Sequence, residues 1–395
     1  MTTTPKSHEF FSALEALRGI AALGVVICHV AWTFPLYDIG LIRNGYLMVD
    51  LFFVLSGFVI SHSYGKRIDT GRDAAKFIWI RLGRLYPLHL TLLFVFLGIE
   101  TAKYIAEREY GLVANKPAFT SNNTFSFISN LLLVQALGFH DKATYNLPAW
   151  SISTEFYTYI LFATMLVFLK KRTAMVYMSA LLIAASITLD SGGLSHNMFR
   201  CIEGFFVGVI AFNFYVALSK HQFSWSEHKW HKHLPGLLSF AGLIVFLSKK
   251  DGTDPDVLIL PLLAVLIVSI AAAPKGLLSI ILEVAPLAWI GRVSYSVYMV
   301  HVAVIWSFSQ LLRVILKIPQ VIDVNGEPLL TPRPLAGALF RAAAIACSLI
   351  LSHITYTYIE DPYRKKSKIL AEKWFFPSTA SCAEYGGRKQ RNQTL

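Results

Sequence analysis

The chain has 395 residues, of which 55% are hydrophobic and 15% are charged, and its mean hydropathy is +0.52. A soluble domain has roughly 25% charged residues, so this composition excludes an ordinary soluble protein. The net charge of +12 does not indicate a nucleic-acid partner, because Lys and Arg are spread over short segments between apolar runs. We therefore expect a single all-α membrane domain and no nucleic-acid partner.

Apolar runs long enough to cross a bilayer, roughly 17 to 25 residues each, recur along nearly the whole chain. They predict about ten transmembrane helices, at residues 14–34, 45–64, 77–104, 148–169, 174–189, 198–219, 235–248, 256–273, 294–316 and 335–359. The spans at 174–189 and 235–248 are short, and the stretch from Phe125 to Phe139 is compatible with a re-entrant segment, so the range is nine to eleven helices. An even number places both termini on one side, and the distribution of Lys and Arg orients the chain N-in and C-in.

This pattern divides the chain into a cytoplasmic N-terminus at 1–13, a transmembrane domain at 14–365 and a polar cytoplasmic tail at 366–395. The N-terminus lacks a signal-peptide cleavage pattern, so the first apolar run is expected to remain as a span. The four cysteines show no spacing of a disulfide framework. The four histidines between residues 221 and 233 match no standard zinc spacing, so we expect no bound metal.

Ionisable residues inside the spans are functional candidates, because each is costly unless it faces a polar interior. Arg18 and His29 lie eleven residues apart in the first span, which is roughly 1100°, or about 20° past three helical turns. Both are therefore expected to face one groove, separated by about 16.5 Å along the helix. Taken singly, Arg18 is also explained as an anchor that reaches lipid phosphate, and His29 as a hydrogen-bonded structural histidine.

Six short motifs occur one after another along the chain. They are Arg18 with His29, Asp50 to Phe58, Arg81 to Pro87, Trp150 to Tyr157, Gly291 to His301, and Glu360 to Pro362. Together they resemble the motifs of membrane-bound acyltransferase family 3. The resemblance extends from residue 10 to about residue 365.

The resemblance implies transfer of an acyl group, usually acetyl, from cytoplasmic acyl-CoA to a hydroxyl of a carbohydrate at the opposite face. The implied partners are acyl-CoA as a substrate, a carbohydrate or lipid-linked glycan acceptor, and membrane lipid, with no resident cofactor. The implied location is the bacterial inner membrane. Some members append an esterase-like domain, which we do not expect in this chain.

The chemistry of this reaction suggests roles for the charged residues. A sugar hydroxyl needs a base to take its proton, and imidazole is well tuned for that, so His29 is the candidate general base. Donor phosphates need guanidinium groups, and Arg81 and Arg84 lie at i and i+3 on one helix face, with Arg18 deeper in the membrane. The alternative role of Arg81 and Arg84 is positive-inside anchoring.

Glu155 completes the candidate catalytic set with Arg18 and His29. A carboxylate within a span is expected to pair with a cation or bind acceptor hydroxyls, and it could alternatively orient His29.

Three further residues, Trp150, Tyr295 and His301, are assigned to substrate binding. Tyr295 and His301 share a helix face with Tyr298, and a structural hydrogen-bonding stripe is an equally good interpretation of that face. Glu360 is expected to be a structural partner of an arginine.

Intramembrane Arg, Glu and His also mark the substrate paths of transporters, so a polysaccharide or small-molecule transporter or flippase is the alternative function. A structural or receptor-like membrane protein is disfavoured by the number of ionisable residues within the spans. An acyltransferase depends on an acyl donor, whereas a transporter needs none and a structural protein turns over no substrate.

Overall fold

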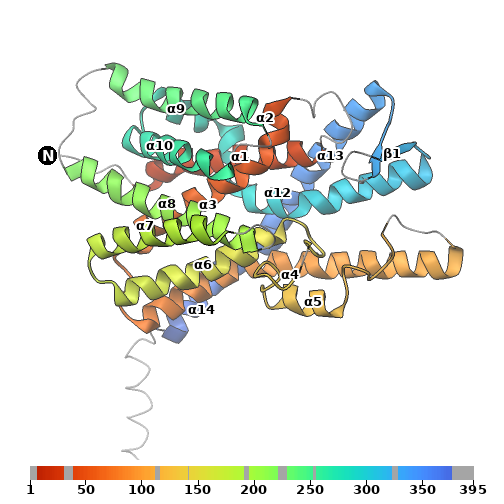
Figure 1. Cartoon of the computed structure of the whole chain (residues 1–395), viewed down its shortest axis with the longest axis horizontal. Helices are drawn as coiled ribbons and strands as arrows, with labels where there is room; N and C mark the ends of the chain where they lie inside the picture. Colours follow the sequence, from red (N-terminus) through yellow and green to blue (C-terminus); the bar gives the residue numbers. More distant parts are fainter. Residues whose placement is uncertain are drawn as a thin grey trace, which may run out of the picture.

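A computed structural model describes residues 7–30, 39–111, 116–140, 142–190, 195–220, 229–251, 255–322 and 328–375. These residues form a bundle of long helices that lie side by side (Figure 1). The only strands among them, β1 (Gln320–Ile322) and β2 (Pro328–Leu330), pair antiparallel between the last two spanning helices.

The helices follow one another in a simple order. They are α1 (Ser7–Val30), α2 (Gly40–Arg43), α3 (Met48–Tyr64), α4 (Gly71–Tyr110), α5 (Thr124–Leu131), α6 (Ala149–Phe168), α7 (Arg172–Leu189), α8 (Ser195–Lys220), α9 (Lys229–Lys249), α10 (Ile259–Ala272), α11 (Leu277–Leu282), α12 (Ala285–Gln310), α13 (Pro334–Thr355) and α14 (Asp361–Phe375).

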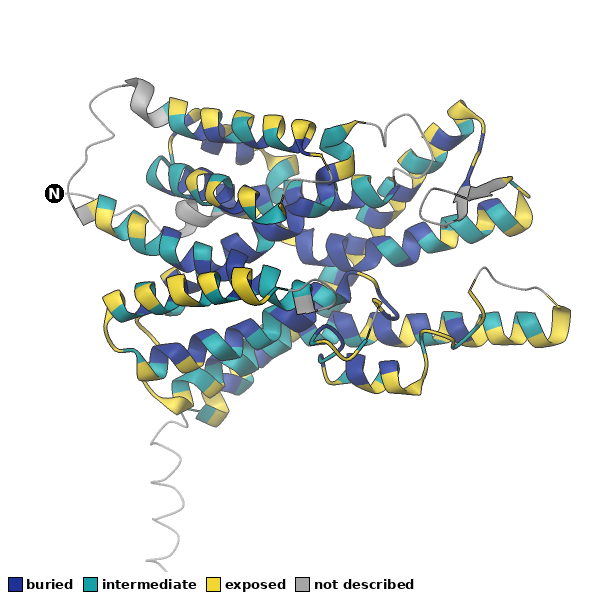
Figure 2. Cartoon of the chain, in the orientation of Figure 1, coloured by how far each residue is buried: buried dark blue, intermediate teal, exposed yellow. Residues whose placement is uncertain are grey.

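Eight stretches of helix in the described residues are long and apolar enough to cross a membrane, and α9 and α10 are shorter apolar helices. These ten correspond to the ten predicted spans, which confirms the all-α polytopic membrane bundle. Buried residues gather where the helices face one another, and exposed residues lie on the outer faces (Figure 2). The stretch from Phe125 to Phe139 forms α5 and turns, and it does not span.

Helices α1 and α12 share the most extensive helix–helix interface of the bundle. They run parallel and in register, because Gly19 faces Gly291 and His29 faces His301. A Cβ atom at Gly19 would lie 2.6 Å from the Gly291 nitrogen, so only glycine permits this approach. The two backbones are therefore in contact. This contact fixes which side chains of α1 lie opposite which side chains of α12.

Helix α4 is 40 residues long and, as the orange helix of Figure 1, reaches the same side of the molecule as β1. A capping box formed by Thr70 and Asp73 begins it, and Gly111, with φ of 65°, ends it in the left-handed region. Its first turns are covered by α14, where Lys76 forms a 2.7 Å ion pair with Glu372. The chain thus remains helical through Phe375, beyond the predicted tail boundary at residue 366, while residues 376–395 lie outside the described residues.

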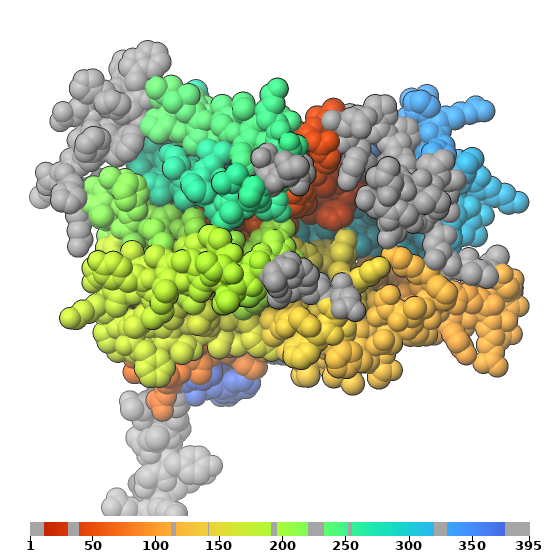
Figure 3. Space-filling model, in the orientation of Figure 1, coloured from red at the N-terminus to blue at the C-terminus, as the bar shows by residue number. Residues whose placement is uncertain are grey.

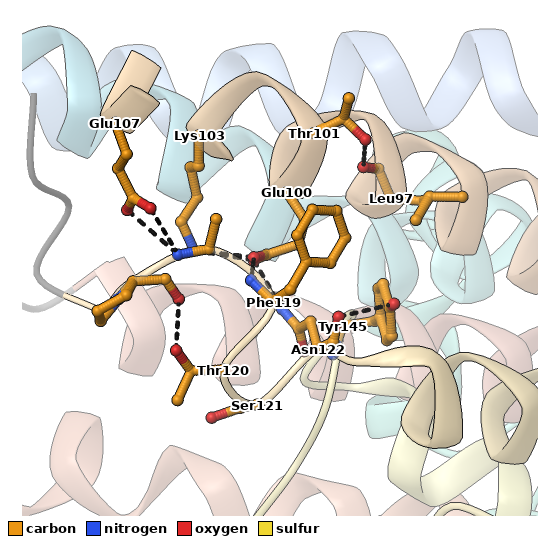
Figure 4. A network of polar contacts seen from close by, with 12 residues as sticks. Leu97, Glu100, Thr101, Lys103, Glu107, Phe119, Thr120, Ser121, Asn122 and Tyr145 are labelled. Carbon is orange, nitrogen blue, oxygen red and sulfur yellow. Dashed lines mark hydrogen bonds and ion pairs between the residues drawn. The ribbon is translucent and has the colours of Figure 1, made fainter. Parts of the chain in front are cut away.

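At the opposite end of α4, a polar network holds the following segment against the helix (Figure 4). Glu100 is buried and accepts hydrogen bonds from Lys103 at 2.9 Å, from the Asn122 amide at 2.8 Å and from the Phe119 backbone at 2.9 Å. Tyr145 donates to the Asn122 carbonyl at 2.9 Å. In the space-filling view this segment, orange to yellow, lies against α4 (Figure 3). The network therefore determines how the chain enters α6.

The glycine contact between α1 and α12 yields a stability prediction. Replacing Gly291 with Ala places a Cβ atom 2.4 Å from the Glu15 carbonyl oxygen, so the helices must separate. We expect a loss of about 1–3 kcal/mol, as for other overpacked cores, seen as a lower thermal unfolding temperature in detergent. The matched control is Gly98→Ala, since a Cβ atom there meets nothing within 4 Å. Equal melting of the two variants would contradict the tight contact.

Candidate functional site

A cavity of about 120 Å³, lined by both apolar and charged side chains, lies between α1, α3, α4, α6 and α12. Five of the eight predicted site residues line it, namely Arg18, Arg81, Arg84, Glu155 and Tyr295. Helices that are distant in sequence thus bring the predicted arginines and the predicted carboxylate into one chamber. The other three predicted residues, His29, Trp150 and His301, do not line this cavity.

The guanidinium group of Arg81 lies among aromatic rings. Its central carbon is 5.2 Å from the ring centre of Tyr64, 5.3 Å from that of Phe77 and 5.5 Å from that of Tyr159. Cation–π attraction offsets part of the cost of removing the charge from water. The Nε atom of Arg81 is buried and has no hydrogen-bond partner among the described residues. Arg81 is therefore held in place by ring faces while it retains donor capacity for an anion.

Glu155 is held by two hydroxyl groups. Ser56 donates to its Oε1 atom at 2.5 Å, and Tyr159, one helical turn further along α6, donates to the same oxygen. Glu155 shares the cavity with the three arginines, and among the described residues it forms no hydrogen bond with His29. The geometry therefore favours its predicted role in pairing with a cation or binding the acceptor over orientation of His29. Both of these hydrogen bonds reach Oε1, and Glu155 also lines the cavity.

The predicted polar stripe on α12 divides between two environments. Tyr295 donates a hydrogen bond to the Leu85 carbonyl of α4 at 2.5 Å, which ties α12 to α4. Tyr298 accepts a hydrogen bond from Ser151 at 3.0 Å and also lines the cavity. Both tyrosines therefore have structural bonds in addition to their place in the cavity wall.

The two histidines lie together beyond Tyr298. The ring centres of His29 and His301 are 5.1 Å apart, and the His301 and Tyr298 rings are 6.0 Å apart. The Nδ1 atom of His29 lies 2.9 Å from the Val25 carbonyl oxygen. This contact assigns the proton to Nδ1 and leaves Nε2 as an acceptor. Tyr298 is thus the side chain between the arginine cavity and the histidine pair.

Trp150 packs against Phe53, which lines the cavity. Its ring centre is 6.0 Å from that of Phe53, and the Arg200 guanidinium is 5.9 Å from its ring centre. Arg200 forms a bidentate ion pair with Asp50, with both N–O distances at 2.7 Å. Trp150 therefore packs against a buried ion pair that joins α3 to α8.

Glu360 is buried and accepts a hydrogen bond from Ser296 at 2.8 Å. Arg84 supplies the strongest opposite charge acting on it, although no ion pair between Glu360 and an arginine is formed among the described residues.

No group of metal-ligating side chains is found in the described part of the chain. His221, His228 and His231 lie outside the described side chains.

A family model described as an acyltransferase domain, acyltransferase family 3, matches residues 11–353. This match covers almost the whole membrane domain and includes every predicted site residue. The chain belongs to acyltransferase family 3. The resemblance deduced from the motifs is thereby confirmed, and the bundle is that of a multi-pass membrane protein of this family.

Bacterial members of the family are similar over most of the chain. A protein of Staphylococcus aureus (strain COL) named "Putative O-acetyltransferase" is 26% identical over 94% of this chain and 60% of its own length. A protein of Bacillus subtilis (strain 168) named "Putative peptidoglycan O-acetyltransferase" is 23% identical over 90% of this chain and 55% of its own length. The chain thus spans about three fifths of the length of these relatives. No solved structure matches it.

Sequence reasoning did not single out every residue that lines this family member's cavity. Ser56 lies in the recognised Asp50 to Phe58 motif, and Tyr159 lies four residues after Glu155, on the same helix face. The i, i+4 spacing of Glu155 and Tyr159 was a usable signal. Nothing local in the sequence paired Asp50 with Arg200, because 150 residues separate them.

The buried ion pair provides the next prediction. Replacing Arg200 with Gln leaves Asp50, whose side chain is 2% exposed, as an uncompensated charge. We expect a loss of about 3–5 kcal/mol in the free energy of unfolding, or a failure to accumulate folded protein. Thermal unfolding in detergent and the yield of monodisperse protein measure this.

The matched control is Lys170→Gln, which removes a 3.9 Å ion pair with Asp69 in which the side chains are 56% and 77% exposed. This exposed pair is expected to contribute only about 0–1 kcal/mol. If Arg200→Gln melted like Lys170→Gln, the Asp50–Arg200 pair would not be a structural element.

Proposed function

We propose that this chain is an integral membrane O-acyltransferase that moves an acyl group, most simply acetyl, from cytoplasmic acyl-CoA to a hydroxyl of an extracytoplasmic carbohydrate. The observation that carries the proposal is the order of groups along the α1–α12 interface. Arg18 lies in the arginine cavity, and His29 lies eleven residues further along α1, about 16.5 Å away. The bacterial relatives named as O-acetyltransferases, one of them for peptidoglycan, support acetyl as the group and a carbohydrate as the acceptor.

In this proposal the arginines bind the phosphates of the donor. Arg81 and Arg84 lie at the end of the bundle that carries the start of α4 and helix α14, which is the predicted cytoplasmic end. Guanidinium groups bind phosphate through paired N–H donors, and acyl-CoA brings several phosphate charges. The pantetheine arm then extends toward His29, and Tyr298 has to move aside for the thioester to arrive.

His29 acts as the general base. Its Nδ1 proton is directed at the Val25 carbonyl, so Nε2 accepts the proton of the acceptor hydroxyl as that oxygen attacks the thioester carbon. The carbon–sulfur bond then breaks, and the CoA thiolate takes the proton back from His29. The donor stays on the cytoplasmic side and the acceptor enters from the opposite face, so neither substrate crosses the bilayer. A bacterial inner membrane provides these two compartments.

The test uses inside-out membrane vesicles from cells that produce the protein, with labelled acetyl-CoA supplied only outside. We expect label to appear in carbohydrate enclosed in the vesicles, and His29→Ala to reduce its incorporation by about 10²–10⁴-fold, since a positioned base contributes that much.

Two outcomes would contradict this arrangement. Near-normal transfer by a purified, monodisperse His29→Ala variant would remove His29 as the base. Movement of unmodified glycan without any need for acetyl-CoA would establish a transporter or flippase instead.

A separate prediction concerns the donor site. Arg81→Ala and Arg84→Ala should each raise the dissociation constant for acetyl-CoA by about 10- to 100-fold, because a hydrogen bond to a charged group is worth about 1.5–3 kcal/mol. Titration calorimetry with purified protein measures this. Lys170→Ala is the control, since it removes an exposed cation at the same end of the bundle. If all three variants bound acetyl-CoA equally, Arg81 and Arg84 would be topology anchors.

A further inference from the structure

His301 is fully buried in α12, with 0% of its surface exposed. Neither of its ring nitrogens has a hydrogen-bond partner among the described residues. The Val297 and Tyr298 carbonyl groups of its own helix lie near the ring but outside hydrogen-bond geometry. An imidazole always carries at least one N–H group, so His301 holds a buried donor that makes no well-formed hydrogen bond with the described residues.

Burying a donor without a partner costs free energy, and such groups in native proteins call for an explanation. A second buried histidine shows the usual solution. His89 in α4 is 1% exposed, and its Nε2 atom lies 2.9 Å from the Asn130 carbonyl oxygen. His301 has no equivalent bond, which indicates that its partner arrives with a ligand.

The place of His301 identifies that ligand. Its ring centre is 5.1 Å from that of His29, the proposed general base. A base must lie within hydrogen-bond reach of the attacking hydroxyl, so the acyl carbonyl under attack lies next to both rings. Within the part of the chain that the structure describes, the rings of Tyr298 and His29 lie beside His301, and no carboxylate forms a hydrogen bond or ion pair with it.

We propose that His301 donates a hydrogen bond to the oxygen of the acyl carbonyl and stabilises the oxyanion that forms there. This inference rests on the proposed acyl transfer and adds a second catalytic residue to it. A neutral imidazole N–H is a suitable donor for a developing oxyanion in a site without water.

The step balances without a further reactant. The acceptor oxygen bonds to the carbonyl carbon and gives its proton to His29, while the carbonyl electron pair moves onto oxygen, where the His301 N–H meets it. When the electron pair on that oxygen forms the carbonyl bond again, the carbon–sulfur bond breaks. The thiolate leaves with the electrons of that bond and takes the proton from His29. His301 keeps its own proton throughout.

The experiment compares His301→Ala, His301→Gln and His301→Asn with the wild type in the vesicle assay with labelled acetyl-CoA. Ala removes the donor, and turnover should fall by about 10²–10³-fold, the usual effect of losing one oxyanion donor. The amide N–H of Gln or Asn stands near the positions of Nε2 or Nδ1, so one of these variants should recover at least about tenfold over Ala. The dissociation constant for acetyl-CoA should stay within about threefold of the wild type, which also shows that each variant is folded.

His89→Gln is the matched control for replacing a buried histidine, and its turnover per folded protein should remain near the wild-type value. A His301→Ala variant that turns over normally would overturn the inference and leave the proposed function intact. Gln and Asn variants as inactive as Ala, with donor binding preserved, would also overturn it and make His301 a second base. A wild-type protein that transfers no label would overturn the proposed function itself.

Discussion

The contact between Gly19 of α1 and Gly291 of α12 brings two helix backbones closer than any side chain permits. Because the helices are parallel and in register, a residue on one helix meets its counterpart at the same level of the other. Ten residues after the glycines, His29 therefore meets His301. Tyr295, four residues after Gly291, bonds to Leu85 of α4 and brings the arginines of that helix to the level of Arg18.

The charges of Asp50, Arg200, Arg81 and Glu155 are compensated in ways that suit their positions. Arg200 and Asp50 form a bidentate ion pair away from the cavity, where no further hydrogen-bonding capacity is needed. Arg81 is instead surrounded by ring faces, and Glu155 by hydroxyl groups. Ring faces and hydroxyls lower the cost of burial without neutralising the charge. The cavity thus keeps charged groups that can bind a ligand.

The separation of the arginine cavity from the histidine pair has a consequence for the proposed chemistry. The arginines are suited to a polyanion and need access to water, whereas an oxyanion is stabilised best where water is excluded. Tyr298 lies between these two environments and contacts both, since it lines the cavity and packs against His301. In the proposed reaction, the same helices would therefore bind the donor at the arginine cavity and carry out the chemistry at the buried histidine pair.

The sequence by itself determined the membrane bundle, its ten spans and the family, because hydrophobic length and local motifs are properties of contiguous segments. Helical spacing put Arg81 and Arg84 on one face of α4, and the chemistry expected of a phosphate-bearing donor placed Arg18 with them. The sequence did not separate His301 from Tyr295, and it did not show that Trp150 packs against Arg200 of the Asp50–Arg200 ion pair. Those distinctions depend on which helix each face meets. Only the tertiary structure decided them, because packing brings together residues more than a hundred positions apart.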